Sequence, residues 1–356
     1  MATQNISPMQ RAQLFAMSTR QNMQMIPKQT STSGLKTLQF SLPKARLLSN
    51  IMVRVSGKVN VKHASKTSIA PDKFGIHNVI RRFSVDLNNG FSPYVVSGKE
   101  LAMLNALEMF GDILNVGSAT QDYTYLNGGT FTASTSGVDN DFAFTLQLPI
   151  TLTKKNPAGL ILLQNEQTNV SLNVDIGQGS DMFETVAGVT AEIKEITVNV
   201  MCETFSIPSS ANAYPDLSVL RLVNGRTDSI PTAGQHIVKL STGTVYRKLL
   251  FMVLDEDGKP VDDSAFSGNF ELIFNMADVN YAITPEMLRA YNTMQYGYTL
   301  PKGMYVFDFS AMTGLPNGDS TRDLIDTERL TEFWLRFTVA GKGHVDLVTD
   351  CIARLQ

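Results

Sequence analysis

Two stretches of this sequence describe the same β-rich unit, one after the other along the chain. Residues 168–177 (TNVSLNVDIG) and residues 331–340 (TEFWLRFTVA) carry apolar side chains at matching alternate positions. Earlier in each half, residues 42–55 (LPKARLLSNIMVRV) match residues 240–253 (LSTGTVYRKLLFMV). The spacing between matching segments shrinks along the chain, as it would if the second copy carried shorter loops. A chain that repeats one sandwich is typical of a structural building block rather than of an enzyme.

Each half also offers one short helix between its matching segments. Ser97-Gly98-Lys99-Glu100 has the form of a capping box that opens the first helix. In the second half Thr284 is the expected cap, and Pro285 suits the first turn. An aromatic residue and a glycine follow both helices, at Phe110-Gly111 and at Tyr296-Gly297. The succession of these elements, more than any single motif, indicates a repeated domain.

The remaining segments predict an all-β fold. Short runs alternate apolar and polar residues, as in VRVSGKVNVK at residues 53–62, and turns rather than helical crossovers join them. This pattern predicts two tandem jelly rolls, each an eight-stranded antiparallel β-sandwich with a short embedded helix. We assign residues 35–207 to the first jelly roll and residues 232–356 to the second. Residues 208–231 are the expected linker, and residues 1–34 an N-terminal helical tail.

That N-terminal segment differs in composition from the rest of the chain. It is rich in Gln and Met and contains no Asp or Glu. Ser7 followed by Pro8 reads as the start of a helix, which we expect to run toward Pro27 and to be followed by a polar linker at residues 29–34. A partly disordered tail fits the same composition equally well.

Three unopposed cations in this segment suggest a role at a lipid surface. Arg11, Arg20 and Lys28 alternate with apolar residues, and a helix of this composition can lie on an anionic membrane. We therefore assign these three as the candidate membrane-facing residues. The alternative is that the helix packs beneath a neighbouring subunit.

The overall charge excludes one class of function. The net charge is −3 and only 18% of residues are charged, against roughly 25% in typical soluble domains. A protein that coats nucleic acid needs a basic face, so we expect no direct nucleic-acid binding. A chain of 43% apolar residues with so few charges is expected to cover much of its surface with partners.

The sequence offers no catalytic motif and no metal-ligand spacing. Its four histidines are scattered, at His63, His77, His236 and His344. Cys202 and Cys351 are too few for a disulfide framework and are expected to be buried, reduced thiols. The acidic residues at 255–263 predict a solvated turn, with Ca²⁺ binding as the alternative. We expect no catalytic residue, no metal and no cofactor.

The order of elements resembles that of the double jelly-roll major capsid proteins of tectiviruses, icosahedral phages with an internal membrane. The resemblance covers nearly the whole chain. It includes the Gln-rich N-terminal helix and the motifs Phe74-Gly75, Phe110-Gly111-Asp112 and Leu300-Pro301-Lys302-Gly303. It implies a non-enzymatic major capsid protein of a membrane-containing icosahedral bacteriophage, located in the virion shell and assembled as homotrimers of pseudo-hexagonal outline.

The resemblance also implies partners. These are neighbouring trimers, minor capsid and vertex proteins, and the lipid surface beneath the shell. Two other readings of the residues stay open. One is a two-domain carbohydrate-binding or host-attachment protein, since jelly rolls also serve as lectins. The other is a β-sandwich glycoside hydrolase, which would need two facing carboxylates.

Overall fold

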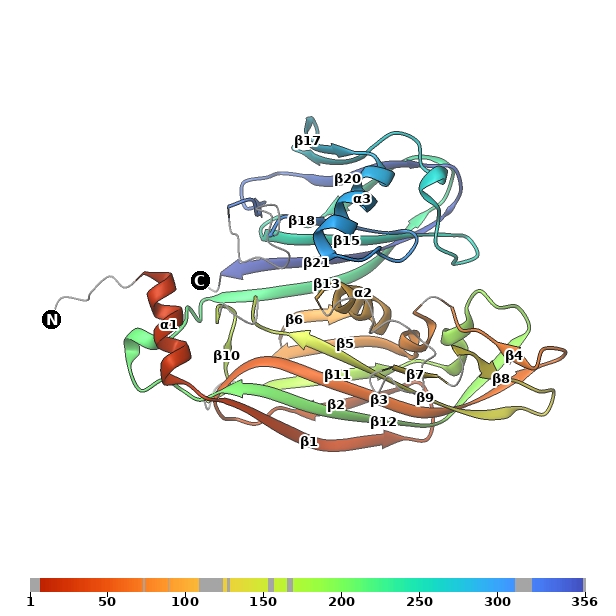
Figure 1. Cartoon of the computed structure of the whole chain (residues 1–356), viewed down its shortest axis with the longest axis horizontal. Coiled ribbons are helices and arrows are strands. Elements are labelled where there is room, and N and C mark those ends of the chain that lie inside the picture. Colours follow the sequence, from red (N-terminus) through yellow and green to blue (C-terminus); the bar gives the residue numbers. More distant parts are fainter. Residues whose placement is uncertain are drawn as a thin grey trace.

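The chain folds into two β-sandwiches that lie side by side. The computed structural model describes residues 7–72, 74–88, 90–108, 124–126, 129–152, 157–164, 169–310 and 322–354. The strands of both sandwiches run mainly along the long axis, and helix α1 (Pro8–Ser18) lies at the same end as the C-terminus (Figure 1). We call the sandwiches the first roll and the second roll.

The first roll contains eight main strands in two sheets. One sheet has the order β1-β12-β3-β9, continued by β7. Its bounds are β1 (Gln21–Ser31), β12 (Val189–Phe205), β3 (Leu47–His63), β9 (Val138–Pro149) and β7 (Thr124–Leu126). The other has the order β2-β11-β5-β6, with β2 (Lys36–Ser41), β11 (Val170–Ile176), β5 (Ile80–Leu87) and β6 (Phe91–Val96). Three short strands accompany them, β4 (Ser68–Ile69), β8 (Phe131–Thr132) and β10 (Ile161–Leu162).

The second roll repeats this order strand for strand. One sheet runs β13-β21-β15-β18, with β13 (Val219–Ile230), β21 (Gly343–Arg354), β15 (Val245–Asp255) and β18 (Met304–Asp308). The short β19 (Ile325–Asp326) pairs with β15. The other sheet runs β14-β20-β16-β17, with β14 (Gly234–Leu240), β20 (Phe333–Val339), β16 (Phe270–Phe274) and β17 (Asp278–Ile283). The predicted pair of eight-stranded jelly rolls is therefore confirmed.

The segments that revealed the repeat occupy equivalent strands. Leu172 lies in β11 and Leu335 in β20, each the second strand of its sheet. Residues 42–55 and 240–253 supply most of β3 and β15, which are both third in their sheets. The alternation that we read from the sequence is the burial pattern of the strands: alternate residues of β11 and β20 are buried in the sandwich.

Each roll contains one α-helix at the same place in its strand order. Helix α2 (Gly98–Glu108) follows β6, and helix α3 (Pro285–Tyr296) follows β17. Short 3₁₀ helices lie in the loops, at η1 (Gly75–Val79), η4 (Gly179–Phe183), η5 (Ala211–Ala213) and η6 (Asp263–Ala265). In the described part of the chain, no helix has the length and hydrophobicity that a membrane crossing requires.

The structure corrects two predictions, and both concern the first strand of a roll. The predicted tail helix stops at Ser18 instead of running toward Pro27, and residues 21–31 form β1 against β12. The predicted linker at 208–231 contains β13, which pairs with β21 over its whole length. Each roll thus begins before the boundary that we assigned, near residues 21 and 219 rather than 35 and 232. Most side chains of β1 are exposed and their burial does not alternate, so no pattern marked it as a strand.

A single β-sheet runs through both rolls. The last strand of one first-roll sheet, β6, pairs in parallel with β13, the first strand of the second roll. Apolar side chains from both rolls, including Val223, Leu250 and Met252 of the second, join one buried cluster with the core of the first. The second roll keeps a separate core of its own around Phe251, Phe270 and Phe333.

Candidate functional site: the seam between the two rolls

The most elaborate buried polar structure of the described chain lies where the rolls meet. We call this region the seam. It comprises α2, β6 and residues 149–152 of the first roll, and β13, β15 and β21 of the second. Arg221, Arg247 and Asp350 lie at its centre, and each is at most 4% exposed. Charged side chains this deeply buried are rare unless they are paired.

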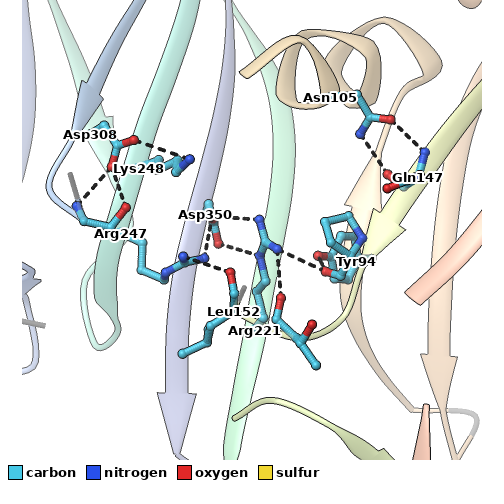
Figure 2. A network of polar contacts seen from close by, with 12 residues as sticks. Tyr94, Asn105, Gln147, Leu152, Arg221, Arg247, Lys248, Asp308 and Asp350 are labelled. Carbon is cyan, nitrogen blue, oxygen red and sulfur yellow. Dashed lines mark hydrogen bonds and ion pairs between the residues drawn. The ribbon is translucent and has the colours of Figure 1, made fainter. Parts of the chain in front are cut away.

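One carboxylate holds two arginines in the seam. Arg221 donates from Nε and Nη2 to the two oxygens of Asp350, at 3.0 and 2.9 Å, and Arg247 donates from Nη1 at 3.0 Å (Figure 2). The forked guanidinium matches the carboxylate in a bidentate pair, which fixes orientation as well as distance. Three strands of the second roll, β13, β15 and β21, are thereby joined at one point.

The same arginines reach across to the first roll. Nη1 of Arg221 donates to the carbonyl oxygens of Thr151 at 3.0 Å and Pro149 at 3.3 Å. Nη2 of Arg247 donates to the carbonyl of Leu152 at 3.0 Å. These carbonyls lie at the end of β9 and just after it, where the ladder with β3 stops, and they need other donors when buried. The seam therefore binds the two rolls by charge-assisted hydrogen bonds that demand one relative placement.

A second buried ion pair lies beside the first. Nζ of Lys248 lies 3.3 Å from Oδ2 of Asp308, which also accepts from the Tyr296 hydroxyl at 2.6 Å. The hydroxyl of Ser310 donates to the other carboxylate oxygen, also at 2.6 Å. Burial alone would raise the pKa of the Asp308 carboxyl, but Lys248 and the two hydroxyls outweigh it and hold the pKa below its ordinary value.

The same balance governs Asp350. Its complete burial would raise its pKa, and the neighbouring Arg221 and Arg247 outweigh that effect, so its pKa lies below the ordinary value. Asp350 is therefore ionised at neutral pH. The Arg221–Asp350–Arg247 cluster therefore stays charged at neutral pH, which suits a structural joint.

Helix α2 meets the second roll at its N-terminus. The predicted capping box is present: the Ser97 N–H donates to Oε2 of Glu100 at 2.6 Å, and the Glu100 N–H donates to Oγ of Ser97 at 3.2 Å. The Glu100 carboxylate lies against Gly225 of β13, where an added Cβ would fall only 1.9 Å from Oε2. Burial raises the pKa of Glu100 to about 7, against the opposing hydrogen bonds to Ser97. Gly225 thus makes room for an acidic side chain of the other roll.

Further contacts extend the seam along α2. Lys99 forms an ion pair with Asp346 of β21 at 2.5 Å. The hydroxyl of Tyr298, just after α3, donates to the carbonyl of Ala106. These contacts tie one helix of the first roll to a strand and a loop of the second.

The three candidate membrane-facing residues do not share a surface. Arg11 is exposed on α1, and Arg20 is exposed just before β1, where its N–H donates to Oγ of Ser206 at 2.9 Å. Lys28 is exposed on β1, eight residues further along an extended strand, or about 26 Å at 3.3 Å per residue. Only the first two lie near the end of the molecule that carries α1.

Helix α1 itself is anchored to the first roll. Phe15 is 4% exposed and packs edge-on against Phe205, with Leu47 and Leu160 beside it. Leu14 and Met17 point away from this contact and are 39% and 85% exposed. The helix therefore has a buried side and a free apolar side.

The other sequence candidates lie apart from the seam or serve it only locally. Cys202 and Cys351 are buried free thiols, as predicted, and burial raises the pKa of each to about 12. In the turn at 255–263, Asp263 binds Arg289 at 2.7 Å. Among the described residues, no His, Cys, Asp and Glu side chains gather as a metal site would require. Phe110-Gly111-Asp112 lies outside the described residues.

Sequence reasoning missed the charged residues of the seam, although the strands carried a signal. Arg221, Arg247 and Asp350 each interrupt an apolar run, in VLRLV, YRKLL and VTDCI. A charge at a core-facing position is expected to find an opposite charge. The sequence alone does not show that these three interruptions meet.

Comparison with solved structures identifies the architecture. The major capsid protein (MCP) of Sulfolobus turreted icosahedral virus (STIV) superimposes with a TM-score of 0.68 at 14% identity, over 94% of this chain and 97% of that one. VP54 of PBCV-1 gives a TM-score of 0.66 at 10% identity, over 95% of both chains. The chain has the double jelly-roll fold of viral major capsid proteins.

A phage protein shares this double jelly-roll fold. The major capsid protein P2 of bacteriophage PM2 gives a TM-score of 0.58 at 10% identity, over 95% of this chain and 98% of that one. No family model and no curated protein matches the sequence. The resemblance to double jelly-roll capsid proteins that we read from the order of elements is confirmed at the level of the fold.

Proposed function

We propose that this chain is the major capsid protein of an icosahedral virus and that its function is to assemble into the virion shell. The observation that carries the proposal is the rigidly joined pair of rolls with identical strand order, matched over nearly its whole length by viral capsid proteins. The seam supports it, because two buried arginines fixed by Asp350 donate to backbone carbonyls of the first roll and hold both rolls in one orientation. A shell needs building blocks of fixed shape.

The finer proposal is a homotrimer with a pseudo-hexagonal outline, from a bacteriophage with an internal membrane. Three chains of two similar rolls supply six similar sandwiches, so a threefold assembly makes contacts that are nearly sixfold. Neighbouring trimers, minor capsid proteins and vertex proteins are the expected partners in the shell.

Light scattering after size-exclusion chromatography tests this assembly. We expect purified protein to elute as a trimer that buries well over 2,000 Å² per interface, the range of obligate contacts. Electron microscopy of concentrated protein should then show hexagonal tiles or closed shells. A stable monomer that binds glycans on an array would contradict the proposal and favour the carbohydrate-binding alternative. Trp334, the one tryptophan, would be the first residue to test there; Lys239 lies 5.9 Å from the centre of its ring.

We further propose that the end carrying α1 faces the lipid surface beneath the shell. Arg11 together with the exposed Leu14 and Met17 supports this, since cations beside apolar groups favour anionic bilayers. Arg20 lies close by, whereas Lys28 lies along β1 and is expected to contribute least. Weak binding by each chain would add up over a shell of many copies.

Flotation with anionic vesicles tests the lipid proposal. Deleting residues 1–30 would remove β1, so Arg11→Glu with Met17→Asp is the better variant, because Phe15 still anchors the helix. We expect this double variant to float less than the wild type, and Lys28→Glu to float almost as well. Equal flotation of all three proteins, or loss confined to Lys28→Glu, would contradict the assignment.

A further inference from the structure

The two rolls can be compared residue by residue, because their helices are held in the same way. Asn105 of α2 brackets the backbone of Gln147, accepting from its N–H at 2.7 Å and donating to its carbonyl at 2.8 Å. Asn292 of α3 brackets Val306 of β18 in the same manner, at 3.1 and 2.8 Å. The strand ladders give the same register, because Gln147 and Val306 face equivalent positions of β3 and β15. Each residue of α2 therefore has a counterpart in α3.

The counterparts differ in burial along one face. Alignment on the caps Ser97 and Thr284 pairs Glu100 with Met287 and Leu107 with Met294. Glu100 and Leu107 are 6% and 1% exposed, whereas Met287 and Met294 are 61% and 78% exposed. In the first roll α2 lies in the seam, where Glu100 lies against Gly225 and the carbonyl of Ala106 accepts from Tyr298. In the second roll the same face carries exposed apolar side chains, which a contact with another copy would cover.

The edge strands differ between the seam and the outer sides of the rolls in the same way. Within the chain, the edge of β6 pairs with the edge of β13, Tyr94 opposite Val223. The counterparts of β6 and β13 are β17 and β1, and in the described structure each is an outermost strand of its sheet. Most of their side chains are exposed. Open edges of this kind are usually protected or paired.

The ladder registers identify which residues correspond. Tyr94 faces Val85 of β5, and Tyr281 faces Leu272 of β16, so Tyr281 of β17 is the counterpart of Tyr94. Val223 pairs with Asp350 on β21, and Met23 pairs with Glu203 on β12. Asp350 and Glu203 face equivalent residues of β15 and β3, so Met23 is the counterpart of Val223 and Met25 that of Gly225.

From this correspondence we propose that β17 and α3 of one copy dock on β1 of a second copy, as β6 and α2 dock on β13 within the chain. The contact pairs β17 with β1 in parallel, Tyr281 opposite Met23. It places Met287 against Met25, where the seam places Glu100 against Gly225. The proposal rests on the proposed capsid function and names the surfaces that join the subunits.

The residues that replace Glu100 and Gly225 at the proposed contact suit a contact between two copies of the chain. In the seam a buried acid lies against a glycine, and the pair needs the cap hydrogen bonds of Ser97. Between copies, two exposed methionines would meet, and methionine adapts its shape to irregular apolar contacts. The usable part of β1 is Gln21–Ile26, because the ladder with β12 is interrupted between Ile26 and Gln29. Pro27 and Lys28 then limit further pairing along this edge.

The two surfaces are different, so the contact is head to tail. Such a contact builds rings when the rotation closes, and every copy uses each surface once. This property gives a sharp test with two complementary variants. Met287→Asp with Met294→Asp removes the α3 surface, and Met23→Asp with Met25→Asp removes the β1 surface. All four side chains are at least 60% exposed, so both variants should keep the circular dichroism spectrum and melting temperature of the wild type.

We expect each double variant alone to be monomeric by light scattering at concentrations where the wild type is a trimer. An equimolar mixture should give a one-to-one dimer and nothing larger, because only one intact pair of surfaces remains. Met17→Asp, which changes an even more exposed methionine on α1, is the control and should stay trimeric. A mixture that remains monomeric, or variants that form trimers like the wild type, would overturn the proposed contact.

A cysteine pair tests the register directly. Native Cys202 and Cys351 are buried, so Met25→Cys with Met287→Cys should give disulfide-linked multimers on mild oxidation. Met17→Cys with Met287→Cys should not. A wild-type protein that assembles while the first pair fails to cross-link overturns this inference alone. A wild-type protein that never self-associates overturns the proposed function as well.

Discussion

The two rolls share one strand order, but equivalent strands differ in burial, and their sequences reflect this difference. Strands β3 and β15 occupy the same place in the first and second roll. Much of β3 alternates between buried side chains and side chains that are partly or fully exposed, because one face of its sheet meets solvent. In β15 all nine residues between Val245 and Asp255 are buried. The apolar run LLFMVL follows from this, because a strand covered on both faces loses its alternation.

The two faces of β15 belong to different cores. Leu249, Phe251 and Val253 point into the second roll, whereas Leu250 and Met252 join the cluster shared with the first roll. The second roll is thus both a sandwich in its own right and the cover of its neighbour. Equivalent positions in a repeated fold are therefore free to diverge wherever only one of them lies in the seam.

The largest expected difference between the two rolls comes from removing the Asp350 carboxylate that Arg221 and Arg247 share. Asp350→Leu leaves Arg221 and Arg247 buried without it, and breaking a buried ion pair costs about 3–5 kcal/mol. Glu203 is the counterpart of Asp350 on β12, is only half-buried, and accepts one 3.3 Å hydrogen bond from Asn50. Glu203→Gln should cost less than about 1 kcal/mol.

Urea unfolding of both variants measures this difference. The Asp350 variant should unfold at a clearly lower denaturant concentration than the wild type, and the Glu203 variant near the wild-type midpoint. Similar losses for the two would show that the seam contributes no special stability.

Most of the fold followed from the sequence, since the alternation of β11 and β20 and the caps Ser97 and Thr284 are local signals. The strands that begin each roll did not follow. β1 is exposed on both faces, so its residues carry no burial pattern to read. In β13 the Asn224-Gly225 step resembles a turn, yet Gly225 lies within a strand that pairs with β21, and Glu100 of the other roll fills the space that a side chain would need. Both errors arise from contacts distant in sequence.

The candidate site was less predictable for the same reason. Ser97 and Glu100 were recognisable as a capping box, but not as a contact with the second roll. Arg221 and Asp350 are separated by more than a third of the chain and meet only because β13 and β21 are neighbours. The lipid assignment grouped Arg11 with Lys28 on one helix, which a strand beginning at Gln21 rules out.

The buried acid of the seam predicts a dependence of stability on pH. The pKa of Glu100 is raised to about 7 by burial, against roughly 4.3 in an unfolded chain. The folded protein therefore binds this proton more tightly than the unfolded chain does. The resulting stabilisation is complete below about pH 4.3 and is lost as the pH rises through 7, a total on the order of 4 kcal/mol.

Glu100→Gln tests this dependence, because the amide stays neutral throughout. The difference between wild-type and variant unfolding free energies should change steadily between pH 5 and pH 8, with the wild type losing stability as the pH rises. Glu286→Gln, on the exposed first turn of α3, is the control and should follow the wild-type profile. Parallel profiles for wild type and Glu100→Gln would mean that the carboxyl is solvated in the seam.

The smallest expected effect separates the two helix caps. Oγ of Ser97 accepts from the Glu100 N–H at 3.2 Å in the seam, and Oγ1 of Thr284 accepts from the Met287 N–H at 3.3 Å at an exposed helix end. Loss of a cap costs about 1 kcal/mol. In Thr284→Ala water can bind the freed N–H, so we expect about 0.5–1 kcal/mol. In Ser97→Ala the freed N–H is enclosed by the second roll, which should raise the loss to about 1–2 kcal/mol.

Thermal unfolding of both alanine variants, with Ser97→Thr and Thr284→Ser as hydroxyl-retaining controls, measures the difference between the two losses. Equal losses at the two caps would show that water reaches the seam end of α2 as freely as it reaches α3.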